Sequence, residues 1–236
     1  MTPSIIDRLR QDLMANVDAK TQASAQHYFK EAITAYGVTV PKVNAISKTY
    51  FGEVKQLDKS VVWDLCETLW QSGILEESFV ACHWSYALSD RFEPADFAVF
   101  ERWVQQYVSN WASCDTLCNH TIGALVERYP VFLENLKVWT ASENRWVRRA
   151  SVVSLIIQAR KGLFLSEVFD LAERLLTDTD DLVQKGYGWL LKAASEAHQE
   201  AVFQFVLAHK TTMPRTALRY AIEKMPPTLK AEAMKK

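Results

Sequence analysis

The sequence is poor in residues that break helices, because only seven glycines and seven prolines occur among its 236 residues. Long stretches without such a residue favour helices over many short strands. The sequence also lacks a run of about 18 apolar residues and an apolar N-terminal segment, which argues against a membrane span and a signal peptide. Its four cysteines lie in apolar, helix-like segments rather than in a short disulfide framework. We therefore expect a cytoplasmic monomer with reduced thiols and no contact with a membrane.

Charge is unevenly distributed along the chain, although the formal net charge is only −1. Residues 51–101 carry ten acids against three bases, a balance of −7, whereas residues 137–161 carry six bases against one acid, a balance of +5. One basic face can hold a polyanion even when the total charge is near zero. The alternative is that these bases only solvate helix surfaces.

Apolar residues recur at three- and four-residue spacing along most of the chain, as in amphipathic helices. Residues 69–81, 138–150 and 175–186 look alike: each ends one helix, turns through small or acidic residues and starts another. A looser copy spans 107–117, so the four copies start 31–38 residues apart. This period predicts an all-α, HEAT-like helical-repeat solenoid forming a single domain over residues 1–236, with a concave groove lined by the second helices of the pairs. The turns at 142–144 and 177–181 should supply N-caps.

Trp111 and Asp115 stand four residues apart and should share one face of a helix. An indole beside a carboxylate suits a cationic or sugar-like transition state, since the ring offers a π face and the carboxylate a negative charge. The alternative is that Asp115 caps a helix while Trp111 packs in a core.

Arg148 and Arg149 are expected in the first turn of a helix, where cations oppose the helix dipole unless a phosphate uses them. Lys185 occupies the place of Arg149 in the next copy. Gly186 and Gly188 interrupt the following helical pattern, each at a cost of about 1 kcal/mol relative to alanine. They would permit close approach of a nucleic-acid backbone or of a neighbouring helix.

The order of several motifs resembles that of the AlkD-like DNA alkylation repair glycosylases. The matching segments are Tyr36-Gly-Val-Thr-Val-Pro41, Leu69-Trp-Gln-Ser, Trp111 with Asp115, Trp146-Val-Arg-Arg149-Ala, Lys185-Gly-Tyr-Gly-Trp189, and Met213-Pro-Arg215-Thr-Ala-Leu-Arg219. The resemblance covers residues 20–225, and it rests on the shared order and spacing of these segments rather than on one signature.

The resemblance implies a set of site residues. The family's counterparts of Trp111 and Asp115 line the lesion site, and that of Arg149 supports the catalytic carboxylate and the DNA backbone. Trp189 matches a second aromatic wall. The implied catalytic residues are thus Asp115, Trp111, Trp189 and Arg149, and the implied DNA contacts are Tyr28, Arg148, Lys185, Lys192 and Arg215. Two departures remove bases that could hold DNA: the family commonly has arginine where this chain has Asn44 and Ser78.

The sequence therefore predicts a DNA glycosylase of base excision repair that hydrolyses the N-glycosidic bond of cationic N3- and N7-alkylpurines in double-stranded DNA. Such bases already carry the positive charge that weakens this bond, so we expect no metal and no cofactor. Two alternatives remain open. The fold could bind distorted or branched DNA without catalysis, or it could be a HEAT-type protein-binding scaffold.

Overall fold

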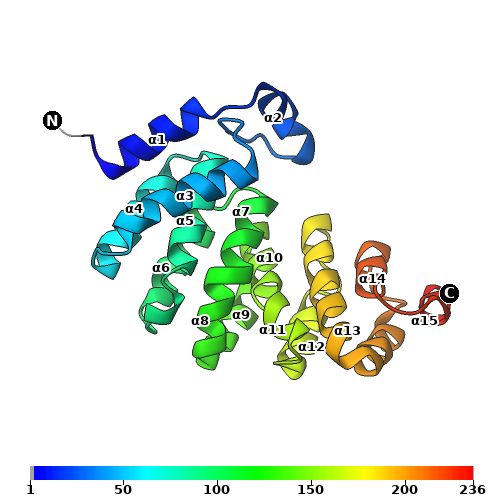
Figure 1. The fold of residues 1–236 in the computed structure, drawn as a ribbon. Coiled ribbons are helices and arrows are strands. Elements are labelled where there is room, and N and C mark those ends of the chain that lie inside the picture. Colours follow the sequence, from blue (N-terminus) through cyan, green and yellow to red (C-terminus); the bar gives the residue numbers. More distant parts are fainter. Residues whose placement is uncertain (1–2, 236) are drawn as a thin grey trace. The chain divides into compact units, whose positions relative to one another are not determined.

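The computed structural model describes residues 3–235 and divides the chain into two compact units, one ending at Leu117 and one beginning at Cys118. The first unit contains α1 (Ile5–Ala15), α2 (Ala19–Ser24), η1 (Ala25–Tyr28), α3 (Val40–Val54), α4 (Lys59–Gln71), α5 (Leu75–Tyr86), η2 (Ser89–Arg91), α6 (Asp96–Gln106) and α7 (Trp111–Thr116) (Figure 1). The π-helical turn η3 (Leu117–Ile122) follows directly on α7.

The second unit continues from η3 as a further series of helices (Figure 1). These are α8 (Gly123–Arg128), η4 (Pro130–Phe132), α9 (Leu133–Trp139), α10 (Arg145–Val153), α11 (Ile156–Arg160), α12 (Leu165–Arg174), α13 (Asp181–His209), α14 (Arg215–Ala221) and α15 (Pro227–Met234). Within residues 3–235 the only β-type pairing is one isolated bridge between Thr34 and Ile74. The all-α helical-repeat prediction is confirmed.

The first unit is built on the antiparallel pair α4 and α5, with α3 packed on α5 and α1 on α3. Its core is rich in aromatic side chains. The Trp63 ring lies edge-on to Phe100, at 5.4 Å between ring centroids, and to Trp103, at 6.1 Å. Such contacts add to the stabilisation that the buried ring area already provides. They give α4 and α6 a shared core.

The second unit is organised around α13, which contacts α10, α11, α12 and α14. This long helix is two helices joined at a kink, because His198 has non-helical dihedral angles (φ −132°, ψ 51°). Nε2 of His198 lies 3.0 Å from the Gly162 carbonyl oxygen, which ties the kink to the turn after α11. The kink lets α13 pack along its whole length.

The predicted repeat turns separate helix pairs as expected, namely α4 from α5, α6 from α7, α9 from α10 and α12 from α13. The predicted N-caps are confirmed: the Asn144 side chain accepts a hydrogen bond from Trp146 N, and that of Asp180 from Leu182 N and Val183 N. These caps satisfy amide groups that the first helical turn leaves unpaired.

Three further observations bear on the sequence predictions. All four cysteines are buried free thiols, and burial raises the pKa of the Cys66 thiol. In the described part of the chain, no helix combines the length and the apolarity that crossing a membrane requires. A single domain over residues 1–236 stays a prediction.

Candidate functional site

Trp111 and Asp115 both lie on α7, as the spacing predicts. The cap of this helix is Asn110, whose side chain accepts a hydrogen bond of 2.9 Å from Ser113 N. Asp115 is the fifth residue of α7 and half-buried, so the alternative that Asp115 caps the helix is wrong. Its carboxylate is not consumed by the orphan amides of the first turn, which Asn110 serves.

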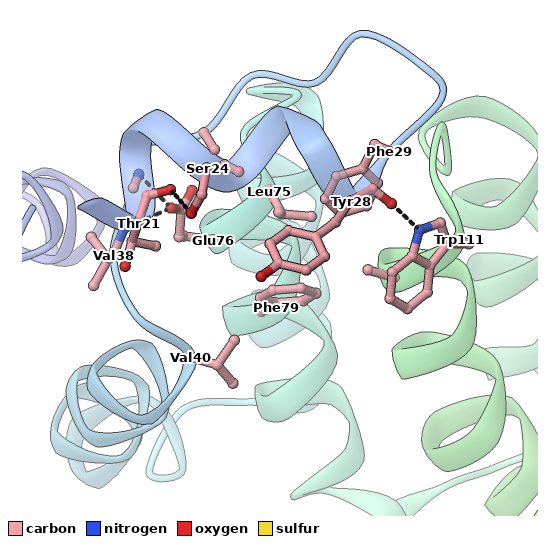
Figure 2. Close-up of a pocket in the computed structure, with 14 residues that line it drawn as sticks. Thr21, Ser24, Tyr28, Phe29, Val38, Val40, Leu75, Glu76, Phe79 and Trp111 are labelled. Atoms are coloured by element: carbon pink, nitrogen blue, oxygen red, sulfur yellow. Dashed lines mark hydrogen bonds between the residues drawn. The ribbon is translucent and has the colours of Figure 1, made fainter. Parts of the chain in front are cut away.

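The Trp111 indole is held in place from two directions. Its Nε1–H donates a 3.1 Å hydrogen bond to the carbonyl oxygen of Tyr28. Its ring stacks on Phe29 with 5.5 Å between ring centroids and 23° between ring planes. Figure 2 shows the donated bond and the Phe29 ring beside the indole. The loop after η1 thus fixes the orientation of Trp111, and Phe29 covers one of its faces.

A pocket of about 250 Å³ opens between this loop and α5. Its lining is predominantly apolar and includes Tyr28, Phe29, Trp111, Phe79 and Val40 (Figure 2). The Tyr28 side chain is 71% exposed, and Figure 2 shows its ring and that of Phe79 pointing into the same space. A flat, apolar and partly open pocket of this kind suits an aromatic or alkyl group.

Glu76 anchors the loop that forms the far side of this pocket. Its carboxylate is buried and accepts hydrogen bonds from three consecutive backbone amides, those of Tyr36 at 3.0 Å, Gly37 at 2.7 Å and Val38 at 2.9 Å. Gly37 has φ +90°, and a Cβ on it would lie 2.4 Å from the Gln22 Cβ. The Tyr36-Gly-Val segment is therefore a backbone nest for a buried carboxylate.

Glu77 makes a second buried carboxylate cluster beside the first. Arg10 of α1 donates to both of its oxygens, from Nε at 3.0 Å and from Nη2 at 2.9 Å, and the Tyr36 hydroxyl donates at 2.6 Å. Burial, together with the Glu77 carboxylate, raises the pKa of Tyr36 far above its usual value. The two glutamates thus join α1 and the Tyr36 loop to the start of α5.

Arg149 lies in the second unit and is 95% buried, with a residual exposure of 5%. Because α10 begins at Arg145, Arg148 and Arg149 are its fourth and fifth residues and lie directly after the first turn in which they were predicted. The Arg149 guanidinium donates from Nη1 to the Leu182 carbonyl oxygen of α13. A Cβ on Gly186 would lie 3.2 Å from Val152 Cγ2 of α10, a tight contact, so the glycine lets α10 pack closely on α13.

Of the two explanations for Gly188, close approach of a nucleic-acid backbone or of a neighbouring helix, the structure supports the second. A Cβ there would lie 2.7 Å from the Tyr220 Cβ and 2.8 Å from the Ala217 carbonyl oxygen. Gly188 therefore lets α14 pack closely on α13, and Gly186 does the same for Val152 of α10. Both glycines serve contacts within the protein.

The basic segment 137–161 is tied into ion pairs. Its bases contact carboxylates within 3.5 Å: Lys137 contacts Glu134 and Asp170, Arg145 contacts Asp180, Arg148 contacts Asp178, Arg160 contacts Glu196, and Lys161 contacts Glu127. Most of these acids belong to other helices or turns of the second unit, so the pairs join one repeat to the next. The local balance of +5 does not make a bare basic face.

The other predicted DNA contacts of the second unit differ in how they are held. Lys185 pairs with Asp181 at 3.1 Å, and Lys192 pairs with Glu223 at 2.9 Å. Arg215 is exposed, and its Nη2 lies 3.3 Å from the Met234 sulfur. Lys185, the half-buried Trp189 and Lys192 follow one another at helical spacing on α13, so they share one face of that helix.

Comparison with protein-family models decides the relationship of the chain. The model described as DNA alkylation repair enzyme matches residues 9–225. The chain belongs to the DNA alkylation repair enzyme family. A solved structure titled "Predicted DNA alkylation repair enzyme from Enterococcus faecalis" superposes with a TM-score of 0.80 at 20% identity, covering 90% of this chain and 98% of that one. This likeness shows a shared fold. Among proteins of curated function, none matches the chain.

Within this DNA alkylation repair enzyme, sequence reasoning missed three residues that shape the first unit. Phe29 stacks on Trp111, Glu76 holds the Tyr36 loop, and Glu77 holds Arg10. A signal existed for Phe29, since it directly follows Tyr28, which the resemblance had singled out. For the glutamates the signal was two adjacent acids at the start of a helix, where a carboxylate is favoured by the dipole. Their partners lie 38–67 residues away and have no local signature.

Proposed function

We propose that this DNA alkylation repair enzyme is a glycosylase that releases cationic N3- and N7-alkylpurines from double-stranded DNA. The observation that carries the proposal is the arrangement on α7. Trp111 is fixed at the edge of an apolar pocket, and Asp115 lies one turn further along the same helix. An aromatic surface and a carboxylate on one face of a helix supply the two features that the reaction needs.

The chemistry is a hydrolysis that needs no acid catalyst. The bond between the sugar C1′ and the purine nitrogen breaks, and its electron pair neutralises the charge of the alkylated base. The sugar develops oxocarbenium character, and the oxygen of water then bonds to C1′ with loss of a proton. In this proposal the Asp115 carboxylate stabilises the developing positive charge on the sugar. Neutral lesions, which need protonation to leave, are poor substrates.

In this scheme the aromatic side chains of the first unit bind the DNA and orient the alkylated base. Phe29 covers one face of Trp111, so the indole offers its other face and edge to the DNA. A cationic base is attracted to an aromatic face by about 0.5–2 kcal/mol. The exposed Tyr28 contacts the DNA beside it. This division makes Trp111 and Tyr28 binding residues and Asp115 the residue that acts on the reacting sugar.

The second unit contributes Arg149 and Trp189 to the proposal. A guanidinium favours the ionised form of a carboxylate and can also bind a phosphate through two parallel hydrogen bonds. Arg149 is already oriented by its bond to the Leu182 carbonyl oxygen. Trp189 supplies a second aromatic wall. Both roles follow from the family resemblance of the segments that carry these residues.

The test is single-turnover release of a methylated purine from duplex DNA. Asp115→Asn keeps the shape and removes the negative charge, so base release should fall by about 10²-fold or more. DNA affinity should persist or rise slightly, because a negative charge near the phosphates is lost.

The matched control is Asp58→Asn, the same change at an exposed residue of the first unit whose side chain makes no cap hydrogen bond. This variant should release the base at the wild-type rate. Wild-type rates in Asp115→Asn would refute the assignment of Asp115. A wild-type protein that binds duplex DNA but releases no methylated base would favour the non-catalytic binder.

A further inference from the structure

Helices α3 and α5 of the first unit pack against each other (Figure 1). A second pocket lies between them. Its volume is about 290 Å³. One wall consists of residues 44, 47, 48 and 51, which share a face of α3, and the other is formed by the last turns of α5, including His83. The buried Trp84 indole spans the two helices and donates a 3.1 Å hydrogen bond to the Ser47 carbonyl oxygen. This bond fixes the spacing of the two walls.

The charged side chain in the lining of this pocket is that of Lys48. Its lining includes the ammonium group of Lys48 and the imidazole of His83, and no acidic side chain. Lys48 is exposed and forms no ion pair with any residue in the described range 3–235. Glu53, the one carboxylate on α3, pairs instead with Arg8 at 2.6 Å. Lys48 therefore keeps its full charge for a ligand.

The polar groups beside Lys48 match an anion of tetrahedral shape. Asn44 lies one turn before Lys48 on the same face of α3, and its amide group can donate hydrogen bonds. The His83 ring stands on the opposite wall. An ammonium group together with amide and imidazole donors is the kind of set that binds a phosphate. The pocket is open to solvent on one side, as a contact to a backbone phosphate requires.

The contrast with the second unit strengthens this assignment. There Arg148, Lys185 and Lys192 already pair with carboxylates at 2.7–3.1 Å. A phosphate that binds such a cation must compete with the carboxylate, which reduces the free energy gained. Lys48 has no carboxylate that competes with the phosphate. Its ammonium group can therefore replace a counterion of the DNA backbone without breaking an ion pair in the protein.

We propose that the pocket between α3 and α5 binds a phosphate of the DNA backbone, with Lys48 as the charged contact and Asn44 and His83 as hydrogen-bonding neighbours. The proposal rests on the proposed function only in taking DNA as the ligand. Its charged contact is Lys48, one helical turn after Asn44, and Lys48 is not among the residues that the family resemblance implies as DNA contacts. This site positions the DNA and reads no base sequence, since a phosphate carries none.

The test is the salt dependence of binding by the full chain to undamaged duplex DNA, followed by fluorescence anisotropy. Each phosphate contact contributes about −0.9 to the slope of log affinity against log salt concentration. Lys48→Gln should therefore make the slope shallower by about 0.9. Asn44→Arg places a second cation on the rim of the pocket and should make it steeper by about the same amount.

Lys42→Gln is the matched control. It removes the same charge from an exposed residue of the same helix, on a face turned about 120° away from that of Lys48. Its slope should equal that of the wild type. A wild-type slope in Lys48→Gln would overturn the proposal, and so would equal changes in the two lysine variants.

Base release separates this proposal from the proposed function. A shallower salt dependence of DNA binding in Lys48→Gln, combined with no release of methylated purine by the wild type, would support the phosphate site and refute the glycosylase. Normal base release by the wild type, combined with an unchanged slope in Lys48→Gln, would refute the phosphate site alone. Circular dichroism of each variant shows that the helical fold is kept.

Discussion

The starts of α5 and α10 occupy the same place in two repeats and carry opposite charges. Helix α5 begins with Glu76 and Glu77, which are buried and bind groups that precede them in the chain. Helix α10 carries Arg145 and Arg148, which bind Asp180 and Asp178 of the following repeat turn. Acids near a helix N-terminus are favoured by the dipole, whereas bases there need compensation. Both repeats use charged residues near the start of the helix to join neighbouring elements, in opposite directions along the chain.

The ion pairs at the starts of α5 and α10 differ in how deeply their charged side chains are buried. The Glu77 side chain has no exposed surface, while those of Arg148 and Asp178 keep 18% and 8%. A fully buried charge that loses its partner is costly, because the lost hydration is no longer offset. Removing one partner of the ion pair at the start of α5 should therefore destabilise the protein more than the same change at α10. Three predictions examine this contrast between the units.

The largest effect is expected for Arg10→Met. It removes both hydrogen bonds that Arg10 donates to the buried Glu77 carboxylate and leaves the one from the Tyr36 hydroxyl. The free energy of unfolding should therefore fall by about 3 kcal/mol. Arg148→Met should cost less, about 1 kcal/mol, because Asp178 keeps its hydrogen bond from Asp180 N. Urea unfolding followed by circular dichroism measures both.

Arg8→Met is the control for the first prediction. Arg8 makes a two-bond ion pair with Glu53, like that of Arg10 with Glu77, but both side chains are well exposed. Water then replaces the lost partner, so the change in stability should be small. Equal losses in Arg8→Met and Arg10→Met would show that burial of the carboxylate does not set the cost.

An intermediate effect is expected from helix packing in the second unit. Gly188→Ala forces α14 away from α13, because the new Cβ would lie 2.7 Å from that of Tyr220, and should destabilise by about 2 kcal/mol. Gly52→Ala in the first unit meets nothing within 4 Å and should stabilise by up to about 1 kcal/mol. The midpoint of thermal unfolding should therefore fall in Gly188→Ala and rise in Gly52→Ala. A Gly188→Ala variant as stable as the wild type would show that the two helices can separate without cost.

The smallest effect is expected from pH. Hydrogen bonding to Arg102 lowers the pKa of Glu67 below its usual 4.5, and bonding to Lys161 lowers the pKa of Glu127. A carboxyl group whose pKa is lowered by folding adds stability above its unfolded pKa and loses it as the pH falls through the folded one. Stability should thus decline below about pH 4.5.

The two carboxylates should contribute unequally to that decline. Glu67 accepts bonds from Arg102, Trp103 and Tyr107, and its side chain is 20% exposed, against 36% for Glu127. Glu67→Gln should therefore flatten the acid decline more than Glu127→Gln does. Unfolding free energies measured at a series of pH values give both slopes. A steeper decline in Glu67→Gln would contradict the assignment.

The helix pairs and their caps could be predicted because they depend on local sequence. Apolar spacing and turn residues placed the four repeat turns, and Asn144 and Asp180 cap the helices as expected. The start of α10 could not be fixed as well. Arg148 was expected in the first turn, but Asn144 is the cap, so the helix begins at Arg145. A turn that contains several small polar residues leaves more than one possible cap.

The tertiary role of charged residues was harder to predict. The acids at 177–181 were interpreted only as caps, yet Asp178 and Asp180 also bind Arg148 and Arg145. Opposite charges spaced by one repeat length were the available signal, since stacked repeats bring such positions together. The loop held by Glu76 had no comparable signal, because its amides belong to the backbone and lie outside the repeats.

The burial pattern of the tryptophans also gives the protein an optical property. Of the eight indoles, Trp63, Trp70, Trp84, Trp103, Trp139 and Trp146 are buried. The remaining two are Trp111 and Trp189, both half-buried. A small polar quencher in solution therefore reaches chiefly the two indoles that we propose as site residues. If DNA covers them, quenching of their fluorescence should fall on binding, while the six buried indoles report the integrity of the core.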